Sequence, residues 1–252
     1  MAIALRKNDE IAKLRAANQI VGATLELLAQ HTKPGVTLKE LDAMAEEYIR
    51  SQGAIPSFKG LYGFPNAVCI SLNEVIIHGI PTDYALQEGD IVGYDIGTKK
   101  EGYFGDAAIT VGVGEISNDD QALIACAKDS LYFAVETIRA DMRFKELSLA
   151  IEEFIKGRGF VPLRGFCGHG IGKRPHEEPE IPNYLDGGNA KAGPKIKNGM
   201  VFCIEPMICH TEGTSKILAN GWDVVSTDGL RGSHYEHTVA IINGRAEILS
   251  IA

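Results

Sequence analysis

Four acidic residues occupy matching places in two similar parts of the chain. Segment 88–95 is echoed by segment 198–205, and segment 102–106 is echoed by segment 232–236. These segments end on Asp95, Glu205, Asp106 and Glu236 respectively. A chain that repeats an acid at both positions is expected to gather four carboxylates at one pseudo-symmetric centre. Four negative charges at one place imply bound metal ions.

Asp95 and Glu205 each belong to an apolar run, so both carboxylates are expected to be buried or half-buried. Two carboxylates about 4 Å apart repel by roughly 4 kcal/mol at an effective dielectric near 20, and a divalent cation more than reverses that repulsion. A salt bridge is the simpler interpretation of any single strand acid. However, no Lys or Arg lies within these runs close to Asp95, Asp106 or Glu205. Glu236 is flanked by histidines, and a surface position on an edge strand remains open.

His169 lies in the glycine-rich segment 168–172, where glycines permit close approach of the backbone to a ligand. A lone histidine is more often a hydrogen-bonded core residue or a surface residue. Beside four carboxylates, His169 completes an oxygen-rich set of five ligands. Such a set favours a pair of divalent ions held roughly 3.5 to 4 Å apart by bridging carboxylates.

Apolar residues at helical spacing, with capping residues before them and glycine or proline after them, predict four helices. These run from a cap at Asn8 or Asp9 to 33–35, from the Thr37/Glu40 capping box to Gly53, from Ser117 and Asp120 through Ile138, and from about Phe144 to Lys156. Short apolar runs predict strands at 67–71, 75–78, 90–98, 103–111, 200–204, 222–226, 234–242 and 246–249. Region 175–197 shows little periodicity and predicts a long surface loop.

The same order of predicted elements, two helices followed by strands, therefore occurs twice along the chain. An offset of 106 relates 37–41 to 143–147, and His-Gly-Ile occurs at both His78 and His169. The pattern predicts an α+β fold in which a curved antiparallel sheet is backed by four helices. We expect residues 1–252 to form one domain built of two related halves, about 8–113 and 117–250.

The composition is that of an ordinary globular chain, with 252 residues of which 45% are hydrophobic. The net charge of −8 is spread along the sequence and gives no reason to expect nucleic-acid binding. No apolar run approaches the length of a membrane span, and the apolar stretch at the start of the sequence is too short for a secretory signal. We therefore expect a cytoplasmic protein. Five cysteines without a Cys-x-x-Cys pair favour reduced thiols over a disulfide scaffold or a zinc finger.

The order of the five candidate ligands, together with the motifs at 168–172, 204–207 and 235–238, resembles type I methionine aminopeptidases from about residue 8 to the end. The acid order alone is shared by the wider group of pita-bread metallopeptidases. The resemblance implies the pita-bread fold and two divalent ions, which can be Co, Mn, Fe or Zn. It also implies removal of the initiator methionine from nascent polypeptides, chiefly where the second residue is small. Transient docking to the ribosome would follow from that role, and no residue marks it.

The resemblance also assigns residues around the substrate. Glu205 would bind metal and accept the proton of the attacking water. His78 would contact the scissile amide nitrogen, and His176 would donate a hydrogen bond to the developing oxyanion. Without the resemblance, either histidine could equally be a solvated loop residue.

The methionine pocket would consist of Phe58, Phe64, Cys69 and Trp222, with Leu61 or Tyr62 near its rim, although core aromatics would look the same in sequence. Two positions depart from the commonest family pattern. Pro175 stands where an aromatic residue often precedes the histidine, and Phe64 stands where a tyrosine is frequent. These departures leave the side-chain preference of the pocket open.

Three alternatives compete with this interpretation. An Xaa-Pro aminopeptidase or prolidase uses similar ligands but usually carries an extra N-terminal domain, whereas here the pattern starts almost at Met1. A type II methionine aminopeptidase would carry an inserted helical segment between His169 and Glu205, where only 35 residues intervene. A non-catalytic peptide-binding module of the same fold normally loses several ligands, and all five are present.

Overall fold

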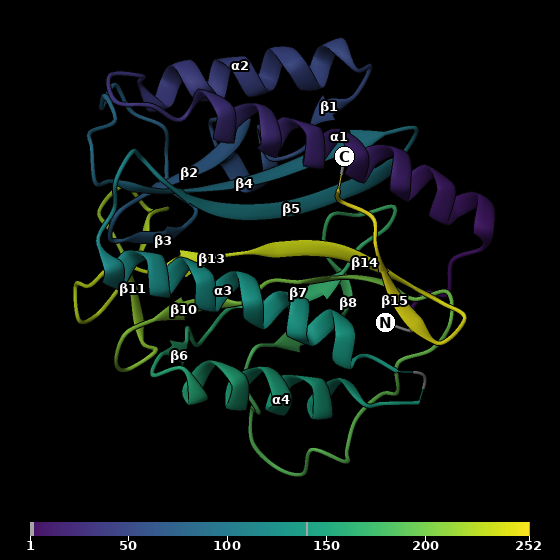
Figure 1. Ribbon diagram of the computed structural model, residues 1–252. Coiled ribbons are helices and arrows are strands. Elements are labelled where there is room, and N and C mark those ends of the chain that lie inside the picture. Colours follow the sequence, from purple (N-terminus) through teal and green to yellow (C-terminus); the bar gives the residue numbers. More distant parts are fainter. Residues whose placement is uncertain (1–2, 140, 252) are drawn as a thin grey trace.

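A nine-stranded antiparallel sheet runs through the computed structural model, which describes residues 3–139 and 141–251 (Figure 1). The strand order is β1-β4-β5-β14-β9-β7-β8, with β2 beside β4 and β15 beside β14. The central strands are β4 (Ile91–Lys100), β5 (Tyr103–Gly112), β14 (Glu236–Ile242) and β9 (Val201–Ile204). The outer strands are β1 (Ile55–Pro56), β2 (Val68–Leu72), β7 (Cys167–Gly170), β8 (Glu177–Pro182) and β15 (Arg245–Ile248).

Two small sheets of three strands flank the main sheet in the described part of the chain. The first has the order β13-β10-β6 and the second the order β11-β12-β3. Their strands are β3 (Val75–Ile77), β6 (Val161–Pro162), β10 (Met207–Cys209), β11 (Ser215–Ile217), β12 (Val224–Ser226) and β13 (Ser233–His234).

The two long hairpins of the main sheet are closed by two-residue turns, as their sequences predict. Glu101 and Gly102 join β4 to β5 with φ of 48° and 82°. Asn243 and Gly244 join β14 to β15 with φ of 50° and 78°. Positive φ at both central residues matches the right-handed twist of the flanking strands. The first turn thereby fixes the register of β4 and β5, in which Asp95 pairs with Ala108 and Asp106 pairs with Gly97.

The four predicted helices are present: α1 (Asn8–His31), α2 (Leu38–Ser51), α3 (Asn118–Thr137) and α4 (Phe144–Gly157). Helices α2 and α4 begin with the same hydrogen bond, in which the backbone N–H before the helix donates to the carboxylate of Glu40 or Glu146 at 2.8 Å. The prediction that Asn8 or Asp9 caps α1 is wrong, because Lys7 holds the capping position and its N–H donates to Glu10 at 3.1 Å.

Each pair of helices packs mainly against the strands of its own half of the sequence. Apolar residues of α1 and α2 form one buried cluster with those of β2, β4 and β5, whereas α3 and α4 share another with β9 and β14 (Figure 1). The two halves meet where β5 pairs with β14. From that junction outward, one half places β5 and then β4, and the other half places β14 and then β9, so the strands form two matching pairs. This α+β arrangement agrees with the predicted fold class.

Helix α1 lies unusually close to β5, at the position of a candidate ligand. A Cβ on Gly105 would come within 2.8 Å of the backbone of Ala17, so a larger residue would push the helix away. The buried side chain of Asn18 accepts a hydrogen bond from the Asp106 N–H at 3.1 Å and donates to the Leu14 carbonyl at 3.0 Å. Helix packing thereby fixes the backbone of Asp106.

Two expectations about segments 167–197 and 78–80 are wrong. The predicted surface loop 175–197 contains β8, which pairs with β7 in the main sheet. The His-Gly-Ile repeats are not equivalent either, because His169 lies on β7 in the main sheet whereas His78 follows β3 in a small one. Strands β7 and β8 contain Gly, Pro and Glu, so their sequences lack the apolar runs on which strand prediction depends.

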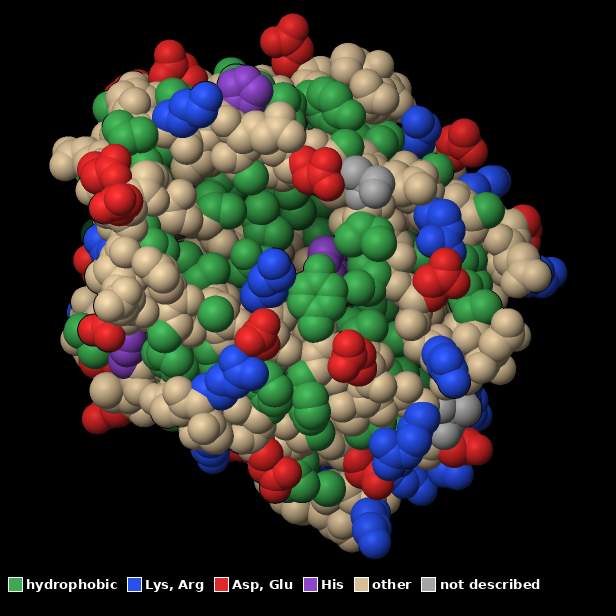
Figure 2. Space-filling view, in the orientation of Figure 1, with side chains coloured by type: hydrophobic (Ala, Val, Ile, Leu, Met, Phe, Trp, Pro, Cys, Tyr) green, Lys and Arg blue, Asp and Glu red, His purple; other side chains and the backbone are tan. Residues whose placement is uncertain are grey.

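Charged side chains of both signs are interspersed on the face shown in Figure 2, and hydrophobic side chains gather in a hollow near its middle. The excess negative charge is therefore not concentrated on this face. In the described part of the chain, no helix combines the length and the apolar character needed to cross a membrane.

We predict that Asp42→Ala destabilises the protein by about 2 to 4 kcal/mol. Asp42 is buried on α2, and its Oδ1 accepts hydrogen bonds from the backbone N–H groups of Ala67 and Val68, both at 2.9 Å. The substitution leaves both donors buried without an acceptor at the start of β2. Urea unfolding measures the effect, with Glu47→Ala on the exposed face of α2 as a control expected to stay within about 0.5 kcal/mol of wild type. Equal stability of the two variants would show that these bonds do not anchor β2.

Candidate metal centre

Three of the four predicted carboxylate ligands lie on central strands, and the fourth directly follows one. Asp95 on β4 and Glu236 on β14 both pair with Ala108 on β5, so these residues form one row across the sheet with their side chains on one face. Asp106 lies two residues before Ala108 and points to the same face. Glu205 follows the last residue of β9, the strand that pairs with β14. The small side chain of Ala108 leaves the space in the middle to the acids.

These carboxylates lack the partners that buried acids normally have. Asp106 and Glu236 are buried and Asp95 and Glu205 are half-buried. Each has one buried oxygen without a hydrogen-bond partner among the described residues. Burial raises the pKa of Asp95 to about 7, and burial followed by repulsion from neighbouring acids raises the pKa of the other three. No Lys or Arg among the described residues lowers any of these pKa values, so the salt-bridge interpretation lacks its cation.

His169 reaches the same place from β7. Its Nε2 lies 3.5 Å from Glu205 Oε1 and 4.0 Å from Asp106 Oδ2. Its Nδ1 lies 3.1 Å from the Gly170 carbonyl, which can only accept, so Nδ1 carries the proton and Nε2 presents a lone pair to the acids. Burial, with a smaller contribution from His176, lowers the pKa of His169 to about 4. The imidazole is therefore neutral at pH 7, as a metal ligand must be.

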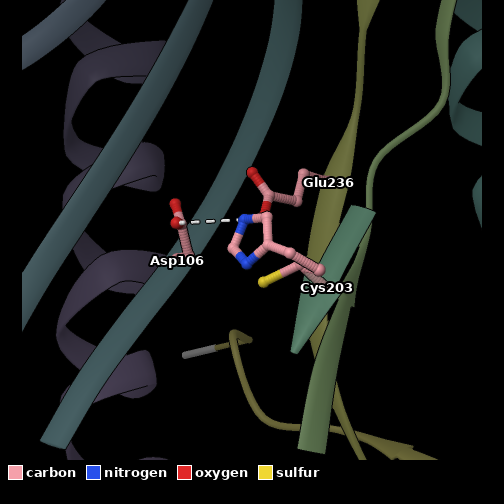
Figure 3. Close-up of side chains that lie close together, drawn as sticks. Asp106, Cys203 and Glu236 are labelled. Carbon is pink, nitrogen blue, oxygen red and sulfur yellow. Dashed lines mark ion pairs between the residues drawn. The ribbon is translucent and has the colours of Figure 1, made fainter. Parts of the chain in front are cut away.

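A thiol that the sequence analysis did not assign joins this group. Cys203, Asp106 and Glu236 point toward a common space in Figure 3. Ligand atoms of these three residues and of His169 all lie within 4.8 Å of one another. Cys203 stands two residues before Glu205 and therefore on the same face of the chain, a signal that period-two alternation could have revealed. The carboxylates and the imidazole form a donor set that fits divalent first-row metal ions.

Two further histidines face the acids from connecting segments. His176 precedes β8, and its ring stands edge-on to that of His169 with centroids 4.5 Å apart. His78 follows β3 with φ of 60°, a conformation that costs free energy in a non-glycine residue and that clusters at functional sites. Its backbone is held there by the Gly79 N–H, which donates to Ser71, and by the Ile80 N–H, which donates to Asp223. Removal from water lowers the pKa of both rings.

An apolar pocket adjoins the acids. Phe58, Phe64 and Cys69 form a separate buried cluster, against which Leu61, Ile80 and Trp222 pack. Phe64 and Trp222 meet edge to face with centroids 5.1 Å apart. Cys69 pairs with Asp95 across β2 and β4, so the cluster begins next to the carboxylates. Tyr62 is 78% exposed and stacks on His176 at 6.1 Å, which places it at the rim.

One cavity of about 530 Å³ is lined by all thirteen residues that the sequence analysis assigned to metal, catalysis or substrate. Sequence reasoning missed several other lining residues, among them Phe166, Cys167, Arg174, Glu180 and His234. Phe166 meets His78 edge to face at 5.8 Å. Pro175 is not among the lining residues, whereas Phe64 is.

The chain resembles known metallopeptidases over nearly its whole length. Residues 12–243 match the model of metallopeptidase family M24. A methionine aminopeptidase of Helicobacter pylori (strain J99) is 59% identical over 251 residues, which cover 99% of each chain. A methionine aminopeptidase of Thermotoga maritima has a solved structure that is 34% identical and covers 100% of both chains with a TM-score of 0.96. A prolidase of Pyrococcus furiosus is 23% identical with a TM-score of 0.78, and the match covers 98% of this chain and 65% of the prolidase.

We predict that Asp106→Asn removes metal binding without loss of fold. The pKa of Asp106 is raised in the folded protein, so at pH 7 folding must either take up a proton at this carboxyl or bury its negative charge. Both processes cost free energy of folding, and this cost disappears below about pH 4, where the unfolded chain is also protonated. At pH 7 the metal-free variant should therefore unfold at the same temperature as metal-free wild type or above it. Added divalent metal should raise the unfolding temperature of wild type only. Calorimetry with metal analysis tests this, and an active variant without bound metal would refute it.

Proposed function

The chain belongs to metallopeptidase family M24 and, within it, to the methionine aminopeptidases, and we infer that its cavity hydrolyses the first peptide bond of polypeptides that begin with methionine. The observation that carries this inference is the convergence of four uncompensated carboxylates, a neutral imidazole and an apolar pocket on one cavity. The family resemblance adds the substrate class, which is the N-termini of newly made polypeptides, and a preference for a small second residue.

We assign Asp95, Asp106, His169, Glu205 and Glu236 as ligands of two divalent ions. Charge balance supports the number, because two divalent ions offset four carboxylates. When bound, such ions supply an activated water and polarise the scissile carbonyl. The donor set suits cobalt, manganese, iron and zinc alike. Cys203 would lie beside this set as a neutral thiol, since burial and the nearby acids raise its pKa well above the usual range.

Glu205 would be the base that accepts the proton of the attacking water. Its position among the other candidate ligands on the same cavity supports this role, because a water held by the ions would lie beside its carboxylate. Asn183 donates to the Glu205 carbonyl at 2.9 Å and so helps to hold the residue beyond the end of β9. The protonated side chain could then deliver the proton to the leaving amine.

His176 and His78 would contact the reacting peptide from different segments. Both rings are neutral at pH 7 because partial burial lowers their pKa values, so each carries one N–H. His176 would donate to the developing oxyanion and His78 would contact the scissile amide nitrogen. Their positions on the same cavity as the acids support these roles.

The pocket of Phe58, Phe64, Cys69 and Trp222, with Leu61 and Tyr62 toward its rim, would hold the methionine side chain. A thioether makes favourable contacts with aromatic ring edges, and the edge-to-face pair of Phe64 and Trp222 provides such edges. The pocket adjoins Asp95 through Cys69, which suits a substrate whose first peptide bond must lie at the acids.

The alternative functions have less support. The match to the prolidase shows the fold alone, since the two sequences are 23% identical, below the 34% and 59% of the methionine aminopeptidases. A non-catalytic module has no need of uncompensated buried acids. We further propose that the chain acts as one catalytic unit of two related halves in the cytoplasm, where contact with the ribosome would bring it to its substrates.

We predict that His176→Ala lowers turnover by about 10² to 10³ because one oxyanion donor is lost. Metal content should stay at the wild-type value, since the five ligands are untouched. Steady-state kinetics on Met-Ala-Ser with metal analysis measures both quantities. His31→Ala, at the exposed end of α1, is the control and should match wild type. Loss of metal from His176→Ala would make His176 a ligand and the assignment wrong.

We predict that the metal-loaded protein cleaves Met-Ala-Ser faster than Met-Leu-Ser and leaves Ala-Pro peptides essentially intact. Dialysis against chelator should abolish cleavage, and added divalent metal should restore it, because the acids then regain their cations. Peptide hydrolysis followed by chromatography is the measurement. A preference for Xaa-Pro peptides would favour the prolidase alternative instead.

A further inference from the structure

His176 stands on a loop with little regular structure of its own. Residues 171–176 join β7 to β8 and lie in neither strand. Within the loop, the Gly172 N–H donates to the Arg174 carbonyl at 3.2 Å, and the Phe104 N–H on β5 donates to the Gly172 carbonyl at 2.9 Å. These bonds hold the start of the loop, but a catalytic donor at its end needs an anchor of its own.

Glu177, the residue after His176, provides that anchor. Its Oε1 accepts hydrogen bonds from the backbone N–H groups of Lys173 at 3.0 Å and Arg174 at 3.2 Å. Its Oε2 accepts a hydrogen bond from the guanidinium of Arg6. One carboxylate thus closes the loop on itself and ties it to a segment 171 residues away in sequence.

Arg6 precedes α1 and is itself held firmly. Its N–H donates to the Gly199 carbonyl at 2.6 Å, next to β9. Its guanidinium lies against Gly172, where a Cβ would clash with Nη2. The side chains of Arg6 and Glu177 are each only 10% exposed. A carboxylate so shielded from water depends on its cation, and removal of one partner from a buried pair is strongly destabilising.

We propose that Arg6 is a positioning residue that, through Glu177, holds the 171–176 loop so that His176 faces the metal ligands. The proposal rests on the inferred role of His176 in hydrolysis. Without the guanidinium, Glu177 turns toward water and the N–H groups of Lys173 and Arg174 lose their acceptor. His176 then leaves its place. His169 stays, because the ladders of β8 and β9 hold β7 on both sides.

The first test compares Arg6→Gln with wild type on Met-Ala-Ser. Misplacement of a catalytic group by about 1 Å costs up to about 10², so kcat should fall about tenfold to a hundredfold while KM and metal content change less than about twofold. Arg15→Gln is the matched control, because Arg15 of α1 forms an exposed ion pair with Glu247 of β15 and neither residue lines the cavity. Its kcat should equal that of wild type. An unchanged kcat in Arg6→Gln, or lost metal, would overturn the proposal.

The second test repeats the substitution in the His176→Ala background. If Arg6 acts through His176, Arg6→Gln should lower kcat less than about twofold there, because coupled residues are not additive. A loss by the same factor in both backgrounds would overturn the proposal. Arg6→Lys keeps the charge without the fork of two N–H donors. It should fold even if Arg6→Gln does not, and its kcat should lie between those of wild type and Arg6→Gln with the same lack of additivity.

A third measurement does not depend on catalysis. The bond after Lys173 is a trypsin site whose following N–H is bound by Glu177. Limited proteolysis should cut this bond several times faster in Arg6→Gln than in wild type or Arg15→Gln. Equal rates would show that Arg6 does not hold the loop. If wild type cleaved no methionyl peptide, the proposed function would fail while this measurement still decided whether the tether exists.

Discussion

The interaction on which the rest of the structure depends is the mutual repulsion of four carboxylates that share the interior of one sheet. In the described part of the chain, no cationic side chain offsets them, so their placement costs free energy that the surrounding fold must supply. The backbone of Asp106 shows how this is done. Its N–H is bound by Asn18 of α1, and its carbonyl accepts from the buried Thr238 of β14 at 2.7 Å. Side chains from two different elements thus hold one ligand in position.

Strands and connecting segments carry different kinds of candidate site residues. The candidate ligands stand on or directly beside strands of the main sheet, where pairing with neighbouring strands fixes the register of each residue. The candidate hydrogen-bond donors His78 and His176 stand in connections instead, because a peptide substrate must enter between them and the acids. Connections lack a ladder, which is why each of these histidines needs side-chain anchors of its own, Ser71 and Asp223 for one and Glu177 for the other.

The convergence of the acids was easier to predict from the sequence than the hairpin of β7 and β8, which carries His169 and adjoins the loop of His176. Asp95 and Asp106 could be found because apolar runs and repeated glycines surround them, and such local patterns decide where central strands form. The hairpin of β7 and β8 was missed because its residues are polar, small or proline, and it owes its strand conformation to pairing with β9 and not to local preference. Cavity residues such as Phe166 and His234 were missed for a related reason, since only tertiary packing brings them near His78 and the acids.

The symmetry of the sheet explains the arrangement of the four acids but not the direction in which a substrate would lie. Strands β4 and β9 each place an acid beside the central pair. On its outer side β4 pairs with β2, as well as with the short β1, and β9 pairs with β7. Strand β2 contributes Cys69, which packs against aromatic residues. Strand β7 contributes His169, whose ring contacts that of His176. A symmetric set of acids would bind a peptide equally well in two orientations. One outer strand lies beside an apolar pocket and the other beside imidazoles. Under the proposed roles of these residues, this difference would favour one orientation, with the methionine side chain in the pocket and its peptide bond near the imidazoles.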